Sequence, residues 1–137
     1  MSLLTSAVSM TRAMIQIDST DPGTYEKAMA DWIEQQLSDL SNVLITRENV
    51  LPGRPNLMAE IPGPKQFPAL VMICHMDTVV IGDGWTLPPF EAIEKDGKIY
   101  GRGACDMKSG LACALTAFKN MVKKVGERGE LPEKPFS

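Results

Sequence analysis

Two short motifs of this chain carry residues that could do chemistry. Segment 74–78, Cys-His-Met-Asp-Thr, follows an apolar run at residues 70–73. Segment 101–108, Gly-Arg-Gly-Ala-Cys-Asp-Met-Lys, places Asp106 in a glycine-bracketed turn just ahead of a helical pattern. Imidazole and carboxylate groups serve as metal ligands and as general acids or bases. The two motifs therefore offer a candidate catalytic or metal site.

His75 directly follows a predicted strand, and sites in open α/β sheets form at the carboxyl ends of strands. The two-residue period of a strand puts His75 and Asp77 on the same side if the strand continues that far. A carboxylate beside a metal-binding histidine can fix its tautomer and raise its basicity. The alternative is a lone, hydrogen-bonded histidine at a strand end, and the residues alone leave both interpretations open.

Asp106 also has a purely structural explanation. Asp is a favoured N-cap because its carboxylate accepts the free backbone N–H groups at the start of a helix. Taken by itself, Asp106 is better explained as such a cap. Lys108 is charged near the same helix start, where the helix dipole disfavours a cation, and this small cost hints at a specific partner.

The cysteines and the histidine count limit the kinds of metal site that this chain can form. The three cysteines have no Cys-x-x-Cys spacing, so a zinc site built from them is not expected. Cys74 and Cys113 are predicted to be small core residues, and Cys105 to be a partly exposed thiol. Because His75 is the only histidine, any metal site here lacks partners.

Length and charge exclude several classes of protein. A chain of 137 residues is long enough for one domain with a core. The net charge of −3 argues against a nucleic-acid partner, which would need a basic face. No apolar stretch approaches membrane-spanning length, and no signal peptide is expected. We therefore expect a soluble cytoplasmic chain with reduced thiols and no membrane partner.

The apolar periodicity predicts an α/β sandwich, with helices alternating with strands. Strand 70–74 is apolar at every position, which is typical of a central strand buried on both faces. Asp96-Gly97 predicts a tight hairpin because both residues tolerate positive φ. The predicted helices cover residues 4–15, 25–40 (capped by Thr24) and 111–125 (ending near Gly126); the other predicted strands cover 43–49, 57–61, 91–95 and 98–100; and 126–137 is predicted to be a loop.

An ordered series of motifs along the chain closely resembles one enzyme family. The motifs are His75-Met76-Asp77-Thr78, Gly82-Asp83-Gly84-Trp85, Pro88-Pro89-Phe90, Asp96-Gly97-Lys98-Ile99-Tyr100-Gly101-Arg102-Gly103 and Asp106-Met107-Lys108-Ser109-Gly110. The family is that of the zinc-dependent exopeptidases and deacylases of the M20 type, which includes acetylornithine deacetylase, succinyl-diaminopimelate desuccinylase, aminoacylase and related carboxypeptidases and dipeptidases. The resemblance implies part of a three-layer α/β sandwich with a mostly parallel central sheet, the zinc-binding catalytic domain of that family.

The resemblance also implies roles for individual residues. His75 matches a ligand of one zinc in a two-zinc site, and Asp106 matches the carboxylate that bridges both ions. Asp77 matches the catalytic-site carboxylate that orients the His75 ring, and the peptide bond Asp106–Met107 is expected to be cis. In the family, paired zincs polarise the scissile carbonyl and hold a hydroxide, a glutamate is the general base, and cobalt or manganese are possible substitutes for zinc.

The chain departs from the family pattern downstream of Asp106. The sequence has no Glu-Glu pair to supply the general base and no second histidine. Residues 1–137 are therefore expected to be an incomplete N-terminal portion of the catalytic domain, inactive as given and without the lid and dimerisation domain. The full-length form is expected to be a homodimer that hydrolyses N-acyl amino acids or short peptides. Dipeptidase or carboxypeptidase cleavage, or a non-catalytic metal- or partner-binding half-domain, are the alternatives.

Overall fold

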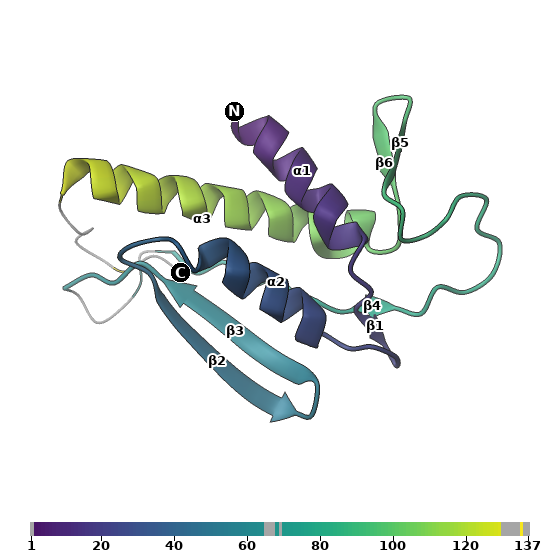
Figure 1. The fold of residues 1–137 in the computed structure, drawn as a ribbon, viewed down its shortest axis with the longest axis horizontal. Coiled ribbons are helices and arrows are strands. Elements are labelled where there is room, and N and C mark those ends of the chain that lie inside the picture. The colour runs from purple at the N-terminus through teal and green to yellow at the C-terminus, as the bar shows by residue number, and fades with distance from the viewer. Residues whose placement is uncertain (1, 65–67, 69, 130–134, 136–137) are drawn as a thin grey trace.

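The computed structural model describes residues 2–64, 68, 70–129 and 135. Its elements are α1 (Leu3–Ile15), β1 (Thr20–Asp21), α2 (Lys27–Leu37), β2 (Leu44–Leu51), β3 (Arg54–Glu60), β4 (Thr78–Val79), β5 (Ile93–Lys95), β6 (Lys98–Tyr100), the π-helical turn η1 (Ala104–Lys108) and α3 (Ser109–Arg128). Helix α1 crosses α3, and α2 lies between α3 and the ribbon formed by β2 and β3 (Figure 1). The chain therefore has the mixed α/β character predicted from its sequence.

The hydrophobic core lies between the helices and the end of β3. Its buried members come from all three helices, together with one residue that follows β3. They are Met14, Met29, Ile33, Leu37, Ile61, Ala112, Leu115, Phe118, Val122 and Val125. Each helix thus packs one apolar face inward.

The ends of the helices differ in part from the prediction. Thr24 does not cap α2, because Tyr25 has φ of 58° and the helix begins only at Lys27. Helix α3 continues through Gly126 to Arg128, and Gly129 after it has φ of 70°, the left-handed conformation common after a helix. Gly126 to Arg128, predicted to be loop, are therefore helical, and the rest of that predicted loop lies largely outside the described residues.

In the part of the chain that the structure describes, the strands form three separate pairs. β2 pairs with β3 and β5 pairs with β6, both antiparallel, while β1 and β4 are parallel with Thr20 opposite Thr78. The β5–β6 turn has φ of 52° at Asp96 and 69° at Gly97, as the hairpin prediction requires. Within the described residues, parallel pairing is limited to β1 and β4, so the mostly parallel central sheet is present only as this short pair.

The prediction of a buried central strand at residues 70–74 is wrong for the described structure. Residues 71–74 belong to no strand, and the side chains of Val71 and Ile73 are 51% and 89% exposed. A strand is buried on both faces only where other strands and helices cover it. Within the described residues, no strand forms a ladder with 71–74.

In the same part of the chain, no helix combines the length and the apolar character needed to cross a lipid bilayer.

Candidate metal site

The structure brings His75, Asp77 and Asp106 together. His75 Nε2 lies 2.9 Å from Asp106 Oδ1, although the two residues are far apart in sequence. On the other side of the ring, Nδ1 lies 3.0 Å from the Asp77 backbone carbonyl and 3.4 Å from its carboxylate Oδ1. Asp77 therefore contacts the ring mainly through its main-chain oxygen, although residues 71–77 form no strand that would place the two side chains on one side.

These contacts determine how protons are arranged on the imidazole. A carbonyl oxygen can only accept, so Nδ1 carries the hydrogen, and Nε2 is the nitrogen that faces the Asp106 carboxylate. The hydrogen bond to Asp106 raises the pKa of His75, burial opposes it, and Asp77 adds to the increase. A raised pKa is what is expected when two acceptors surround the ring without a cation between them.

The donor set fits a metal ion bound between His75 and Asp106. Zinc bonds to imidazole nitrogen and carboxylate oxygen are about 2 Å long, so two ligand atoms of one ion lie roughly 3 Å apart. The 2.9 Å separation of Nε2 and Oδ1 agrees with this spacing. The Asp106 side chain is 88% exposed, so an ion can reach it from solvent.

Asp106 owes its position to an irregular turn. Gly103, with φ of 77°, starts η1, and inside that turn Asp106 has the non-helical φ of −124° and ψ of 100°. The Asp106–Met107 peptide bond is cis, as the resemblance implied. Helix α3 has Lys108, without a side-chain cap, at its N-cap position. The N-cap explanation for Asp106 is therefore wrong, and its carboxylate faces His75 instead.

Lys108 is a feature of this region that sequence reasoning only hinted at. Its side chain is 1% exposed, and its ammonium donates a 2.7 Å hydrogen bond to the Ile17 carbonyl. Burial lowers the pKa of Lys108 to about 8, and the nearby Asp18 carboxylate opposes that decrease. The partner inferred from the unfavourable helix position is thus a backbone carbonyl just after the end of α1.

The cysteines contribute little to the site. Cys105 is exposed, as predicted, whereas Cys74 is half-buried, and burial raises the pKa of its thiol. Cys113 is also exposed, so its prediction as a core residue is wrong; it lies outside the buried stripe of α3.

Within the part of the chain that the structure describes, no three His, Cys, Asp or Glu side chains gather to hold a metal ion.

Comparison with known proteins supports the resemblance. Residues 71–131, which include both motifs, match the model of peptidase family M20/M25/M40. The chain belongs to this family. Among its relatives, a succinyl-diaminopimelate desuccinylase of Herminiimonas arsenicoxydans is 36% identical over 121 residues, 87% of this chain and 31% of the relative. A probable succinyl-diaminopimelate desuccinylase of Staphylococcus epidermidis is 39% identical over 97 residues, 68% of this chain and 23% of the relative.

A third M20 relative acts on a different kind of molecule. The N-formyl-4-amino-5-aminomethyl-2-methylpyrimidine deformylase of Bacillus subtilis is 34% identical over 102 residues, 72% of this chain and 24% of the relative. The chain spans less than a third of the length of these three relatives. Membership of the M20 family confirms the predicted resemblance, while the roles of His75, Asp77 and Asp106 remain predictions.

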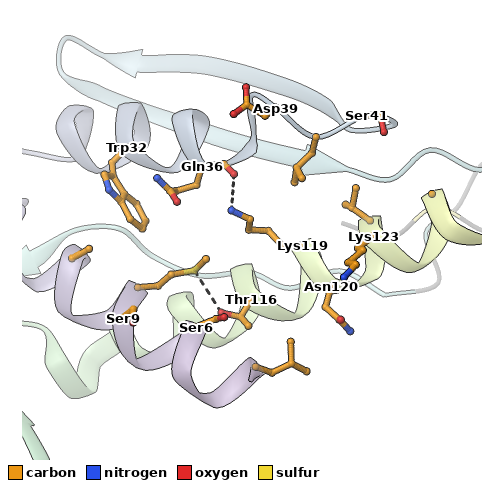
Figure 2. Close-up of a pocket in the computed structure, with 16 residues that line it drawn as sticks. Ser6, Ser9, Trp32, Gln36, Asp39, Ser41, Thr116, Lys119, Asn120 and Lys123 are labelled. Carbon is orange, nitrogen blue, oxygen red and sulfur yellow. Dashed lines mark hydrogen bonds between the residues drawn. The ribbon is translucent and has the colours of Figure 1, made fainter. Parts of the chain in front are cut away.

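A separate groove of about 720 Å³ lies between the three helices, and neither His75 nor Asp106 lines it. Figure 2 shows Trp32 and Gln36 of α2 opposite Ser6 and Ser9 of α1, with Lys119 of α3 between the helices. The Lys119 ammonium donates a 2.9 Å hydrogen bond to the Gln36 carbonyl, marked by a dashed line. This groove is thus distinct from the pair of motifs that forms the candidate site.

Proposed function

We propose that the whole protein of which this M20 chain forms part is a metal-dependent amide-bond hydrolase acting on an N-acyl amino acid. The observation that carries the proposal is the 2.9 Å approach of His75 Nε2 to Asp106 Oδ1, inside the segment that matches the family. The names of the relatives support the reaction class, since a desuccinylase and a deformylase both remove an acyl group from nitrogen. Cleavage of a dipeptide or of a C-terminal residue is the second choice of substrate.

In this proposal, His75 and Asp106 hold the metal and Asp77 orients the imidazole. The Asp77 carbonyl keeps the hydrogen on Nδ1, which leaves Nε2 as the ligand atom. An imidazole and a carboxylate suit zinc, with cobalt or manganese as substitutes. When bound, the metal would supply Lewis-acid polarisation of the scissile carbonyl.

The 137-residue chain by itself is proposed to bind metal weakly and not to turn over substrate. Two protein ligands are fewer than the three that a catalytic zinc normally has. The sequence also contains no Glu-Glu pair to supply the general base of the family mechanism. The remaining ligands, the base and the dimerisation surface of the proposed homodimer would come from other parts of the whole protein.

The test begins with the gene. We would extend the reading frame past Ser137, express the whole protein and assay hydrolysis of N-succinyl and N-acetyl amino acids and of dipeptides, with and without a zinc chelator. His75→Ala and Asp106→Asn are each expected to lower kcat by at least about a hundredfold, because loss of a group that only supports a metal ligand already costs about ten- to a hundredfold. Asp83→Asn, in an exposed loop, should leave kcat unchanged. Full activity in both site variants would refute the proposal.

A second candidate, a partner-binding role, is favoured by the exposed apolar segment 70–73. Leu70, Val71 and Ile73 are 48%, 51% and 89% exposed, while Met72 packs against the core. An exposed apolar segment that belongs to no strand is suited to pairing with another strand. We propose that this segment pairs with a second copy of the chain. Sedimentation of the 137-residue chain tests this: Ile73→Lys should abolish any self-association, and association that persists in the variant would contradict the idea.

A further inference from the structure

The short connection between α1 and β1 contacts the loop that carries His75 and Asp77. The Ser19 hydroxyl donates a 2.8 Å hydrogen bond to the Met76 carbonyl. The Thr78 amide in turn donates a 2.9 Å hydrogen bond to the Ser19 carbonyl, and β1 continues the pairing alongside β4. Ser19 is fully buried. The residues on both sides of Asp77 are therefore fixed to this connection.

The same connection also contacts the turn that carries Asp106. The buried Lys108 ammonium reaches across from the end of η1 to the Ile17 carbonyl, 2.7 Å away. The amide of Lys108 also donates to the Gly103 carbonyl at 2.9 Å, and this bond closes the turn around Asp106. The two ends of the Asp106 turn are thus joined to each other and, through one side chain, to residue 17.

Burial of the Lys108 ammonium is energetically unfavourable. Burying a charge is unfavourable unless it is paired or hydrogen-bonded, and an apolar side chain of similar shape is often as good or better for stability. Methionine would fill the volume of the Lys108 stem without that cost. What methionine cannot do is bind the Ile17 carbonyl, and this bond joins the Asp106 turn to the segment that holds the His75 loop.

We infer that residues 17–20 form a clamp that sets the distance between His75 and Asp106, with Lys108 and Ser19 as positioning residues of the metal site. The inference rests on the proposed function, because it assigns the clamp to that same site. Groups that orient metal ligands from behind typically change metal affinity by about ten- to a hundredfold when they are removed.

The chain offers matched controls for both positions. Lys119, on the helix that Lys108 precedes, also donates to a backbone carbonyl, that of Gln36 at 2.9 Å, but in the interhelical groove (Figure 2). The buried Thr116 hydroxyl donates to the Ala112 carbonyl at 2.7 Å, just as Ser19 donates to Met76. Lys119→Met and Thr116→Val therefore remove the same kinds of hydrogen bond away from the site.

The experiment is a Zn²⁺ titration of the 137-residue chain, followed by NMR of the His75 ring, whose signals are unambiguous because it is the only histidine. Lys108→Met and Ser19→Ala are expected to raise the zinc dissociation constant about tenfold or more. Lys119→Met and Thr116→Val are expected to change the zinc dissociation constant by less than about twofold, even where they lower the urea midpoint as much as Lys108→Met and Ser19→Ala do. If Lys108→Met folds and binds zinc as tightly as the parent chain, the clamp is refuted. If Lys108→Met does not fold, zinc binding by Ser19→Ala as tight as that of the parent chain refutes the clamp.

Amide hydrogen exchange separates failure of the clamp from failure of the metal site. If the parent chain binds no zinc at His75, the proposed metal site fails, and exchange then tests the clamp alone. Without the Lys108–Ile17 bond, the Thr78 amide should exchange at least about tenfold faster in Lys108→Met than in Lys119→Met. Equal exchange rates in these two variants would overturn the clamp.

Discussion

Gly103→Ala is expected to be one of the most damaging small substitutions in this chain. Gly103 has φ of 77°, and a Cβ built there would lie 2.5 Å from Thr78 Cγ2 and 3.2 Å from Lys108 Cδ. Thr78 is β-branched and buried, so its methyl group has little freedom to move aside. The substitution therefore combines backbone strain with a steric clash at the point where the Asp106 turn packs against β4.

The magnitude is the sum of these two effects. A left-handed backbone costs a residue with a Cβ about 1–2 kcal/mol. Forcing an extra carbon into a packed site costs about 1–3 kcal/mol more. The sum is a loss of about 2–5 kcal/mol for Gly103→Ala. Gly53 is a matched control, because it has the same φ of 77° and a Cβ added there would meet no atom within 4 Å.

Urea unfolding followed by circular dichroism measures both variants. Gly53→Ala should lose only the strain contribution of about 1–2 kcal/mol. With a slope of about 1–3 kcal/mol per molar urea, the further loss in Gly103→Ala should lower its midpoint by roughly 1 M relative to Gly53→Ala. Equal midpoints for the two variants would refute the reasoning, since they would show that Thr78 moves aside without cost.

Two further predictions concern stability. Burial alone would raise the pKa of Glu26, but hydrogen bonds from Arg54 outweigh it and hold the pKa below 4.5. The ionised Glu26 therefore stabilises the fold above pH 4.5, and this stabilisation is lost as the pH falls through the folded-state pKa. Glu26→Gln should lower the free energy of unfolding by about 1.5–3 kcal/mol at pH 7 and flatten the acid side of the stability–pH curve. An unchanged acid side would contradict this prediction. Leu37 is 1% exposed in the core, and Leu37→Ala should lower the free energy of unfolding by about 2–5 kcal/mol. Leu4 is 75% exposed, and Leu4→Ala should lower it by less than about 0.5 kcal/mol. Urea midpoints measure both losses, and equal losses would contradict the prediction.

Local sequence patterns predicted the elements that depend on local interactions. Helices α1, α2 and α3 follow from apolar residues at helical spacing, and all three contribute buried residues to the core. The β5–β6 hairpin follows from Asp96-Gly97, because the conformational tolerance of these two residues selects the turn. Such features need little knowledge of the rest of the chain.

Helix ends and burial were harder to predict because distant partners decide them. Thr24 looked like a cap, but Tyr25 after it has a positive φ and the helix begins only at Lys27. Glu26, at the observed N-cap, bonds to Arg54 from the start of β3 rather than capping the helix. Segment 70–74 has the composition of a buried strand, but burial depends on neighbouring strands that its own residues do not encode.

The sequence by itself determined the α/β class, the family and the identity of the candidate ligands, because residue types at fixed spacing carry that information. Only the tertiary structure decided that Asp106 faces His75 Nε2 at 2.9 Å instead of capping α3. It also decided that Asp77 holds the ring mainly through its carbonyl and that Lys108 is buried against Ile17. The contacts of Asp106 with His75 and of Lys108 with Ile17 join segments far apart in the chain, and their geometry is set by the packing of α1, η1 and α3 rather than by any local pattern.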